Sequence, residues 1–296
     1  MSEGGAAGNG RVHPRNTLNE LDGERWLYFT KSVLTTSYPR ELGHDLRRTH
    51  GANKPPRLMK ALVEYFTKGG QRVLDPFAGV GGTLLGAGLC EPPRRAVGIE
   101  VSPRWAEVYA RVAASQPRLP GQEMIVGDCR ALLADRARFP DGSFDFVATD
   151  PPYNVHLERT MCDGKYDATH ANRRTDYDMR SADPADLANL GTYGDYLAAM
   201  EEVFGLCRRV VRPGGYMAVI VRNAYQDGEY LFTHADLARR ARAAGWIPKG
   251  EIVWYQTGSR LRPYGYPHAF VPNIAHQFVV ILQKPKGKGK GKAADA

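Results

Sequence analysis

The chain alternates short apolar runs with longer amphipathic stretches. Runs rich in β-branched and aromatic residues predict seven strands, at 72–75, 96–100, 124–126, 144–148, 216–221, 252–255 and 278–282. Apolar positions at helical spacing predict helices over 58–66, from about 84, over 103–114, over 196–211 and over 233–244. Strands that alternate with helices indicate an α/β domain, with a mostly parallel seven-stranded sheet and helices on both faces.

Polar segments suggest how the chain is divided. Residues 1–22 are Gly-rich and polar, which predicts a disordered N-terminal arm. Residues 23–284 form the predicted domain, and its polar stretch at 155–187 is interpreted as a mobile or target-recognition loop. Pro213-Gly214-Gly215 is expected to stop the helix that precedes it. Residues 285–296 form a basic Gly/Lys tail.

Four predicted strands each end on an acidic residue: Asp75, Glu100, Asp128 and Asp150. A single acid at a strand end is usually a solvated cap, but the carboxyl ends of parallel strands share one edge of a sheet, where ligands bind. A glycine-rich turn follows Asp75 and leads into a helix, whose first N–H groups can face a ligand. Leu84 replaces the third glycine of the dinucleotide fingerprint, which disfavours a pyrophosphate ligand.

The strand over 144–148 runs into the sequence Thr149-Asp150-Pro151-Pro152-Tyr153. Each proline fixes its own φ, lacks an N–H and forces the residue before it into an extended conformation. The result is a stiff turn that holds a carboxylate, backbone carbonyls and an aromatic ring close together. Such a turn can be an ordinary strand end, but the preceding glycine turn and acids favour a functional site.

Composition narrows the class of protein. The net charge of +8 and a pI near 9.3 favour a polyanionic partner, although part of the excess lies in the tail. Four cysteines lie far apart without a C-x-x-C pair, so we expect neither a zinc site nor a disulfide framework, and no metal. The N-terminus has no apolar signal region and no run has the length of a membrane span. We therefore expect a soluble cytoplasmic protein without a membrane partner.

These motifs resemble the N4/N6 amino-methyltransferase family, enzymes that methylate exocyclic amines of adenine or cytosine in DNA with S-adenosyl-L-methionine. The resemblance covers about 50–283 and rests on Asp75-Pro76-Phe77-Ala78-Gly79-x-Gly81 and on Asp150-Pro151-Pro152-Tyr153. Lys54-Pro55-Pro56, Gly98-Ile99-Glu100 and Pro213-Gly214-Gly215-Tyr216 fit as well. It implies a Rossmann-like methyltransferase fold and a role in DNA methylation, including restriction–modification.

The resemblance also implies roles for individual residues. The catalytic residues would be Asp150, Pro151, Pro152 and Tyr153, with the Asp150 carboxylate and Pro151 carbonyl holding both amine hydrogens and Tyr153 stacked on a flipped base. The cofactor-binding residues would be Asp75, Phe77, Gly79, Gly81, Thr83, Glu100, Asp128, Cys129 and Lys54. Glu100 would accept from the ribose hydroxyls and Asp128 from the adenine amino group.

The substrate is less sharply defined. An aspartate at position 150 favours adenine N6, because the cytosine-N4 enzymes more often have serine there. The alternatives are cytosine N4 in DNA, an RNA amino-methyltransferase acting on adenine N6 or guanine N2, and a non-catalytic, cofactor-binding DNA-binding subunit. The chain could act as a monomer or a homodimer.

No large target-recognition domain is visible in the sequence. The candidates for this role are 155–187 and 259–272, and the second interleaves basic with aromatic residues. We expect nucleic-acid contacts from Arg173, Arg174, Arg260, Arg262 and Tyr264. The alternatives are plain disorder for 155–187 and a solvated hairpin for the segment around 260–266.

Overall fold

A central sheet organises the chain in the computed structural model, which describes residues 10–116, 119–120, 122–152, 181–259 and 261–287. The sheet has eight strands in the order β1-β9-β10-β6-β5-β2-β3-β4. Their bounds are β1 Val33–Leu34, β2 Arg72–Asp75, β3 Arg95–Glu100, β4 Glu123–Val126, β5 Phe144–Thr149, β6 Val211–Val221, β9 Ile247–Tyr255 and β10 His276–Gln283. All seven predicted strands are present, and β1 is an eighth that the sequence pattern did not predict.

The sheet is mostly parallel, as predicted. β4, β3, β2, β5 and β6 run in parallel, whereas β10 is antiparallel to both β6 and β9. The chain proceeds from β2 outward to β3 and β4, and then returns to the other side of β2 to form β5. This reversal is the switch point of a Rossmann-like sheet, where a crevice opens at the carboxyl ends of the strands. The ends of β2 and β5 therefore meet at the expected ligand site.

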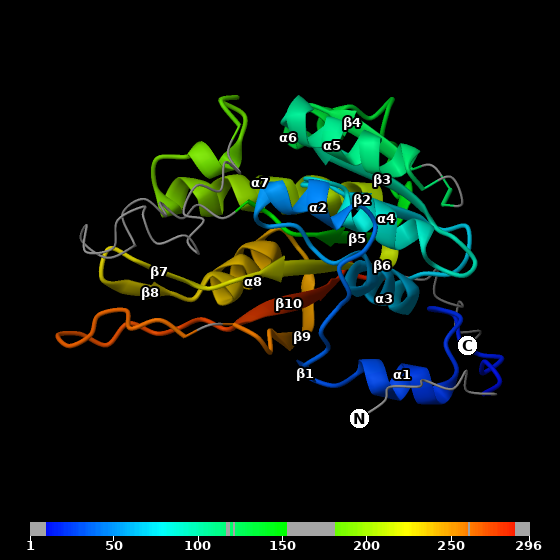
Figure 1. Cartoon of the computed structure of the whole chain (residues 1–296). Helices are drawn as coiled ribbons and strands as arrows, with labels where there is room; N and C mark the ends of the chain where they lie inside the picture. The colour runs from blue at the N-terminus through cyan, green and yellow to red at the C-terminus, as the bar shows by residue number, and fades with distance from the viewer. Residues whose placement is uncertain (1–9, 117–118, 121, 153–180, 260, 288–296) are drawn as a thin grey trace, which may run out of the picture.

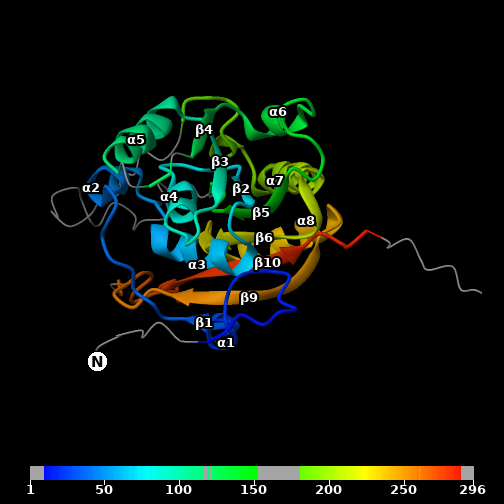
Figure 2. The same ribbon diagram turned by 90° about the vertical axis from the view of Figure 1, so that its right-hand side faces the viewer.

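Helices cover both faces of the sheet (Figure 2). The helices are α1 Gly23–Phe29, α2 His44–Arg47, α3 Pro56–Phe66, α4 Gly82–Gly88, α5 Pro103–Ala114, α6 Cys129–Ala134, α7 Tyr193–Val210 and α8 Thr233–Ala243. α3, α4 and α5 pack on one face, and α6, α7 and α8 pack on the other (Figure 2).

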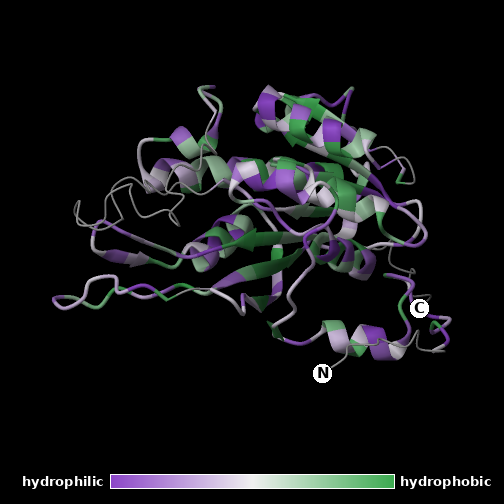
Figure 3. Cartoon of the chain, in the orientation of Figure 1, coloured by the Kyte–Doolittle hydropathy of each residue, from purple (hydrophilic) through white to green (hydrophobic). Residues whose placement is uncertain are grey.

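Alternate residues of strand β6 contribute to two hydrophobic clusters, one on each face of the sheet. Met217, Val219 and Val221 belong to the hydrophobic cluster that includes α7, whereas Ala218 and Ile220 belong to the cluster that includes α3. Successive side chains of a strand point to opposite faces, so a strand covered on both sides is apolar throughout. Figure 3 shows the apolar residues concentrated in the central strands.

The helix before β6 ends differently from the prediction. α7 ends at Val210 and β6 begins at Val211, so Pro213-Gly214-Gly215 lies inside the strand instead of stopping the helix. The register between β5 and β6 shifts between Phe144 and Phe146, next to this segment. Gly214 has φ +77°, a left-handed conformation that suits an irregularity in a strand.

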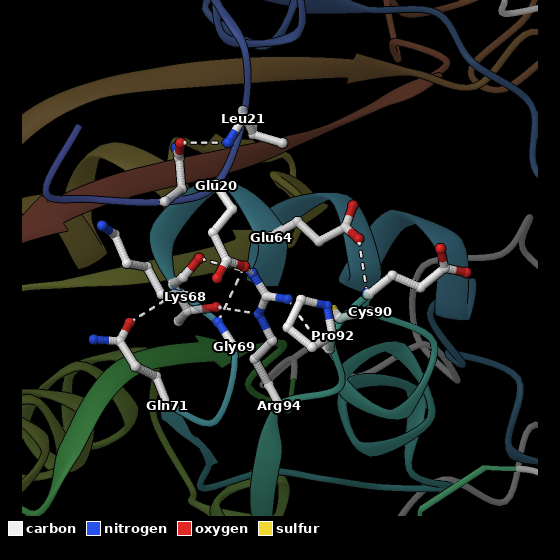
Figure 4. Close-up of polar contacts among 12 residues, drawn as sticks. Glu20, Leu21, Glu64, Lys68, Gly69, Gln71, Cys90, Pro92 and Arg94 are labelled. Atoms are coloured by element: carbon white, nitrogen blue, oxygen red, sulfur yellow. Dashed lines mark hydrogen bonds and ion pairs between the residues drawn. The ribbon is translucent and has the colours of Figure 1, made fainter. Parts of the chain in front are cut away.

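The segment from residue 10 to α1 packs on the domain, which differs from the disordered arm expected over 1–22; residues 1–9 lie outside the described residues. Asn19 and Leu21 are buried, and the Asn19 side chain donates to the Tyr65 carbonyl at 2.6 Å. At the amino ends of the strands, the guanidinium of Arg94 donates to Glu20 at 3.0 Å (Figure 4). Arg94 is only 2% exposed, so this contact ties the segment to the core.

Two segments project from the carboxyl edge of the sheet (Figure 1). One is the hairpin β7 (Ala224–Gln226) and β8 (Glu229–Leu231), which follows β6. The other is 261–275, which joins β9 to β10 (Figure 1). Within the described parts of the chain, no helix is both long and apolar enough to cross a membrane.

Candidate active site

The glycine-rich turn joins β2 to α4. Gly79 and Gly81 have φ of +51° and +77°, a left-handed conformation that side chains disfavour. A Cβ on Gly81 would also lie 2.1 Å from a ring carbon of Tyr109. Both the backbone conformation and the close packing therefore require glycine at position 81.

Asp75 holds this turn in place. Its Oδ1 accepts from the backbone N–H of Phe77 at 3.1 Å and from the hydroxyl of Thr149 at 2.8 Å. Its Oδ2 accepts from the hydroxyl of Thr83 at the start of α4. Burial raises the pKa of Asp75 to about 6, against the lowering effect of these hydrogen bonds. Asp75 thus links β2, α4 and β5, which makes it a positioning residue in this structure.

Glu100, at the end of β3, faces the same turn. Its two oxygens accept from the backbone N–H groups of Gly79 and Ser102, each at 2.8 Å. The residue is 8% exposed, and burial raises its pKa to about 7. An ionised carboxylate offers about four acceptor positions, so Glu100 retains capacity for ligand hydroxyl groups.

Asp128 and Cys129 follow β4. The Asp128 carboxylate caps α6 by accepting from the Arg130 N–H at 2.8 Å, and it also forms an ion pair with the Arg130 guanidinium at 3.1 Å. The Cys129 side chain is buried in the hydrophobic cluster around α7, where burial raises the pKa of its thiol to about 12. Packing therefore accounts for the Cys129 side chain.

Asp150 and Pro151 lie directly beyond β5. The Asp150 side chain is 15% exposed, Pro151 is buried and Pro152 is partly buried. The ammonium group of Lys54 contacts Asp150 Oδ2. The structure thus brings Lys54, predicted as a cofactor residue, against the predicted catalytic carboxylate. Tyr153 lies outside the described residues.

His50 is a candidate that the sequence did not single out. Its ring lies 3.5 Å from the position that a Cβ on Gly79 would occupy, and it contacts the Trp105 ring edge-on with centroids 4.8 Å apart. Burial, followed by the positive charges of Lys54, Arg47 and Arg104, lowers its pKa to about 4, so the imidazole is neutral at pH 7. Its buried Nδ1 has no hydrogen-bond partner among the described residues. The sequence marked this stretch only as a turn.

The predicted nucleic-acid contacts are only partly described. Arg173, Arg174 and Arg260 lie outside the described residues. Arg262 and Tyr264 lie in the projecting segment 261–275, where the Arg262 backbone exchanges two hydrogen bonds of 2.8 Å with the Asn273 side chain. Three apolar or aromatic side chains of this segment are largely exposed: Leu261 by 78%, Tyr266 by 81% and Phe270 by 86%. Such exposure is unusual for a segment without a partner.

Part of the chain is similar in sequence to two curated tRNA methyltransferases. Over 107 residues the chain is 33% identical to a tRNA (guanine(10)-N2)-dimethyltransferase of Pyrococcus abyssi, a match that spans 36% of this chain and 30% of that protein. The corresponding enzyme of Methanothermobacter thermautotrophicus is 35% identical over 101 residues, or 34% of this chain and 27% of the relative. The chain therefore covers about a third or less of the curated relatives that it matches.

Solved structures give weak overall similarity. A DNA modification methylase from Thermus thermophilus, complexed with S-adenosyl-L-methionine, is 24% identical over 57% of each chain, with a TM-score of 0.36. TrmN from Thermus thermophilus is 16% identical over 77% of this chain and 48% of that one, with a TM-score of 0.47.

A family model gives the broadest match. The model for DNA methylases of the N6/N4 methyltransferase type matches residues 15–111 and 144–293. These ranges include the glycine-rich turn, Glu100 and the Asp150-Pro151-Pro152 turn, and they span most of the chain. The protein therefore belongs to the N6/N4 DNA methylase family.

Proposed function

We propose that the protein is a DNA methyltransferase that transfers a methyl group from S-adenosyl-L-methionine to an exocyclic amine, with adenine N6 as the target. One observation carries the proposal: the carboxylate of Asp150 and the glycine-rich turn after β2 meet at the switch point of the sheet. Asp75 and Thr149 join the two by a 2.8 Å hydrogen bond, so their relative position is fixed by the fold.

The residues present fit the cofactor. Glu100 has buried carboxylate oxygens with acceptor capacity for the two ribose hydroxyls. The unpartnered Nδ1 of His50, next to Gly79, offers a further hydrogen-bonding group at the turn. When bound, S-adenosyl-L-methionine supplies the methyl group in electrophilic form.

The chain itself contributes orientation and electrostatics. The lone pair of an aromatic amine is delocalised into the ring, so the amine is a weak nucleophile. Two acceptors, the Asp150 carboxylate and the Pro151 carbonyl, would hold the two amine hydrogens and favour a pyramidal nitrogen with a localised lone pair. Tyr153 would stack on the base, which has to leave its helix to reach this site.

The projecting segments support a nucleic-acid substrate. The segment 261–275 and the hairpin β7–β8 extend from the same edge of the sheet as Asp150 (Figure 1). Exposed aromatic rings such as Tyr266 are suitable for stacking on bases, and Arg262 supplies positive charge. The net charge of +8 favours binding to phosphates.

An RNA amino-methyltransferase is the second candidate. The curated relatives methylate guanine N2 in tRNA, and this favours an exocyclic amine in RNA as a substrate. The match spans only about a third of this chain, whereas the DNA methylase family model spans most of it. We therefore rank DNA first.

Nucleoside mass spectrometry tests the proposal. The protein is incubated with labelled S-adenosyl-L-methionine and, in separate reactions, genomic DNA and total RNA, and labelled nucleosides are identified. N6-methyladenine in DNA is the expected product, and N4-methylcytosine there would change only the base. Methylation confined to RNA would overturn the substrate class. Absence of label in both, from protein that binds the cofactor, would overturn the assignment as an enzyme.

A further inference from the structure

A cavity lies beside the proposed active site, between the chain before α3 and the end of β9. Its volume is about 430 Å³, and its walls come from residues within 36–41, 44–56 and 254–259. β9 is antiparallel to β10, which is antiparallel to β6, so β9 ends at the same edge of the sheet as β5 and β6. Asn53 and Pro55 line the cavity, and Lys54 between them contacts Asp150. The short segment 53–55 thus borders both the cavity and Asp150.

The cavity has basic side chains in its lining. Arg40, His44 and Arg47 line it. Burial, followed by the positive charges of Arg40 and Arg47, lowers the pKa of His44, so the two arginines supply the positive charge at pH 7. The negative charge of Glu41, which also lines the cavity, is already neutralised by Arg57, whose guanidinium donates to the two Glu41 oxygens at 2.7 and 3.0 Å.

The guanidinium groups of Arg47 and Arg40 retain unused hydrogen-bond donors. Arg47 is only 1% exposed, and its buried Nε has no hydrogen-bond partner among the described residues. One other Arg47 nitrogen, Nη2, donates to the Lys54 carbonyl at 2.6 Å, which orients the group. Arg40 is exposed and forms no ion pair with any residue in the described ranges. An unsatisfied buried donor is costly, so it points to a missing anionic acceptor.

The cavity also has neutral hydrogen-bonding groups in its lining. Thr36, Ser37, Thr257 and Ser259 line it, and the hydroxyls of Ser37 and Thr257 lie 2.9 Å apart. Trp254 and Tyr38 also line the cavity, with their rings edge-on and their centroids 6.1 Å apart. Arginine forks and hydroxyls are the groups that bind phosphate oxygens and sugars in nucleic-acid interfaces. A volume of about 430 Å³ lies within the roughly 300–1,000 Å³ usual for ligand pockets.

We propose that this cavity is a phosphodiester-binding subsite, in which Arg40 and Arg47 hold the backbone of the nucleic-acid strand that carries the target base. The inference rests on the proposed function, because it assumes a nucleic-acid substrate. A phosphate held here would fix the strand beside Asp150 without reading its sequence. The carboxylate of the cofactor's methionine part is the other anion that could use the same donors, and the experiment separates the two.

The test compares Arg40→Gln with a matched control. Arg48→Gln removes the same charge from an exposed side chain that does not line the cavity. Dissociation constants for a fluorescent 20-nucleotide DNA, single- and double-stranded, and for RNA of the same sequence are measured over a range of salt concentrations. Cofactor affinity is measured separately by calorimetry. Arg47→Lys, which keeps the charge but loses the guanidinium fork, is the second variant.

We expect Arg40→Gln to weaken nucleic-acid binding and to reduce the slope of log K against log salt by about one, with unchanged cofactor affinity. Arg48→Gln should leave the slope unchanged. Equal effects of the two variants on nucleic-acid binding would overturn the inference, since they would indicate only a general electrostatic attraction by the whole protein surface. Weakened cofactor binding with normal nucleic-acid binding would assign the anion to the cofactor instead. If the unsubstituted protein binds neither DNA nor RNA, the proposed function itself is overturned. This result differs from weakened binding that is confined to Arg40→Gln.

Discussion

The ammonium group of Lys54 contacts the carboxylate of Asp150, across 96 positions of the sequence. The side chains are 7% and 15% exposed, so this is a largely buried ion pair. Lys54 lies two residues before the start of α3, and Asp150 follows β5. The pair therefore fixes the position of the carboxylate relative to the segment 53–55, which also borders the neighbouring cavity.

Replacing Lys54 by Met should lower the free energy of unfolding by about 3 kcal/mol, because an ion pair between two largely buried side chains is lost. Urea denaturation measures this change. Asp150→Asn and the double variant complete a mutant cycle. The double variant should be more stable than the sum of the single effects predicts, and strict additivity would show that the two side chains do not interact.

Asp150→Ala should separate chemistry from cofactor binding. We expect kcat to fall by at least about 10²-fold, because one of the two acceptors that orient the amine is lost. The dissociation constant of S-adenosyl-L-methionine should stay near normal. Glu100→Gln should show the reverse pattern, with weaker cofactor binding. Equal loss of both properties in Asp150→Ala would make Asp150 a cofactor residue.

Stability should fall with rising pH because of Glu100. Burial raises the pKa of Glu100 from an ordinary 4.5 to about 7, so the folded protein binds this proton more tightly than the unfolded chain. Its contribution is fully present below about pH 4.5 and is lost as the pH rises through about 7, a change of about 3 kcal/mol.

Asp75, with a pKa raised to about 6, adds a change of the same sign. Thermal unfolding of the ligand-free protein between pH 4.5 and 8 measures the sum. Glu100→Gln should flatten the profile. A profile that is identical with and without this substitution would contradict the assignment to Glu100.

Thr149→Val should loosen the turn after β2. It removes the 2.8 Å hydrogen bond to a buried carboxylate, and bonds to charged groups contribute roughly 1.5–3 kcal/mol. We expect the free energy of unfolding to fall by about 2 kcal/mol and cofactor affinity to weaken as well. Reduced stability with unchanged affinity would mean that the link between Asp75 and β5 does not position the cofactor site.

Removal of residues 288–296, most of the basic tail at 285–296, should weaken nucleic-acid binding and reduce its salt dependence. Three lysines lie in this segment, and each phosphate contact contributes about −0.7 to −0.9 to the salt slope. Turnover at saturating substrate should be unchanged, because an electrostatic contact with phosphates would affect binding and not the methyl transfer step. A truncated protein that retains the full salt slope would exclude a contribution from the tail.

Periodicity predicted most of the fold because the central strands are apolar on both faces and the helices have one apolar face. It missed β1, a two-residue strand stabilised by pairing with β9 and not by its own pattern. The order within residues 16–22 was also missed, since it depends on polar side chains such as Asn19, which bonds to Tyr65 far along the chain.

The strand-end carboxylates of the candidate site could be predicted from the sequence, whereas the contacts between its separate segments could not. The carboxylates after β2, β3 and β5 follow from the rule that strand ends share one edge, and Asp75, Glu100 and Asp150 do so. The pairing of Lys54 with Asp150 and the position of His50 beside Gly79 could not be predicted from spacing. Both contacts depend on the path that the turn before α3 takes past the edge of the sheet, and the spacing of residues does not determine that path.

The short pairing of β1 with β9 has a practical consequence for handling the protein. β1 pairs with Val253 and Trp254 at the outer edge of β9, and the Ser32 carbonyl accepts there from the Val253 N–H at 2.7 Å. A chain shortened to begin after residue 35 would expose that edge to a second molecule, and open strand edges promote aggregation. Preparations that keep residues 10–35 should therefore stay monodisperse at concentrations where the shortened form precipitates.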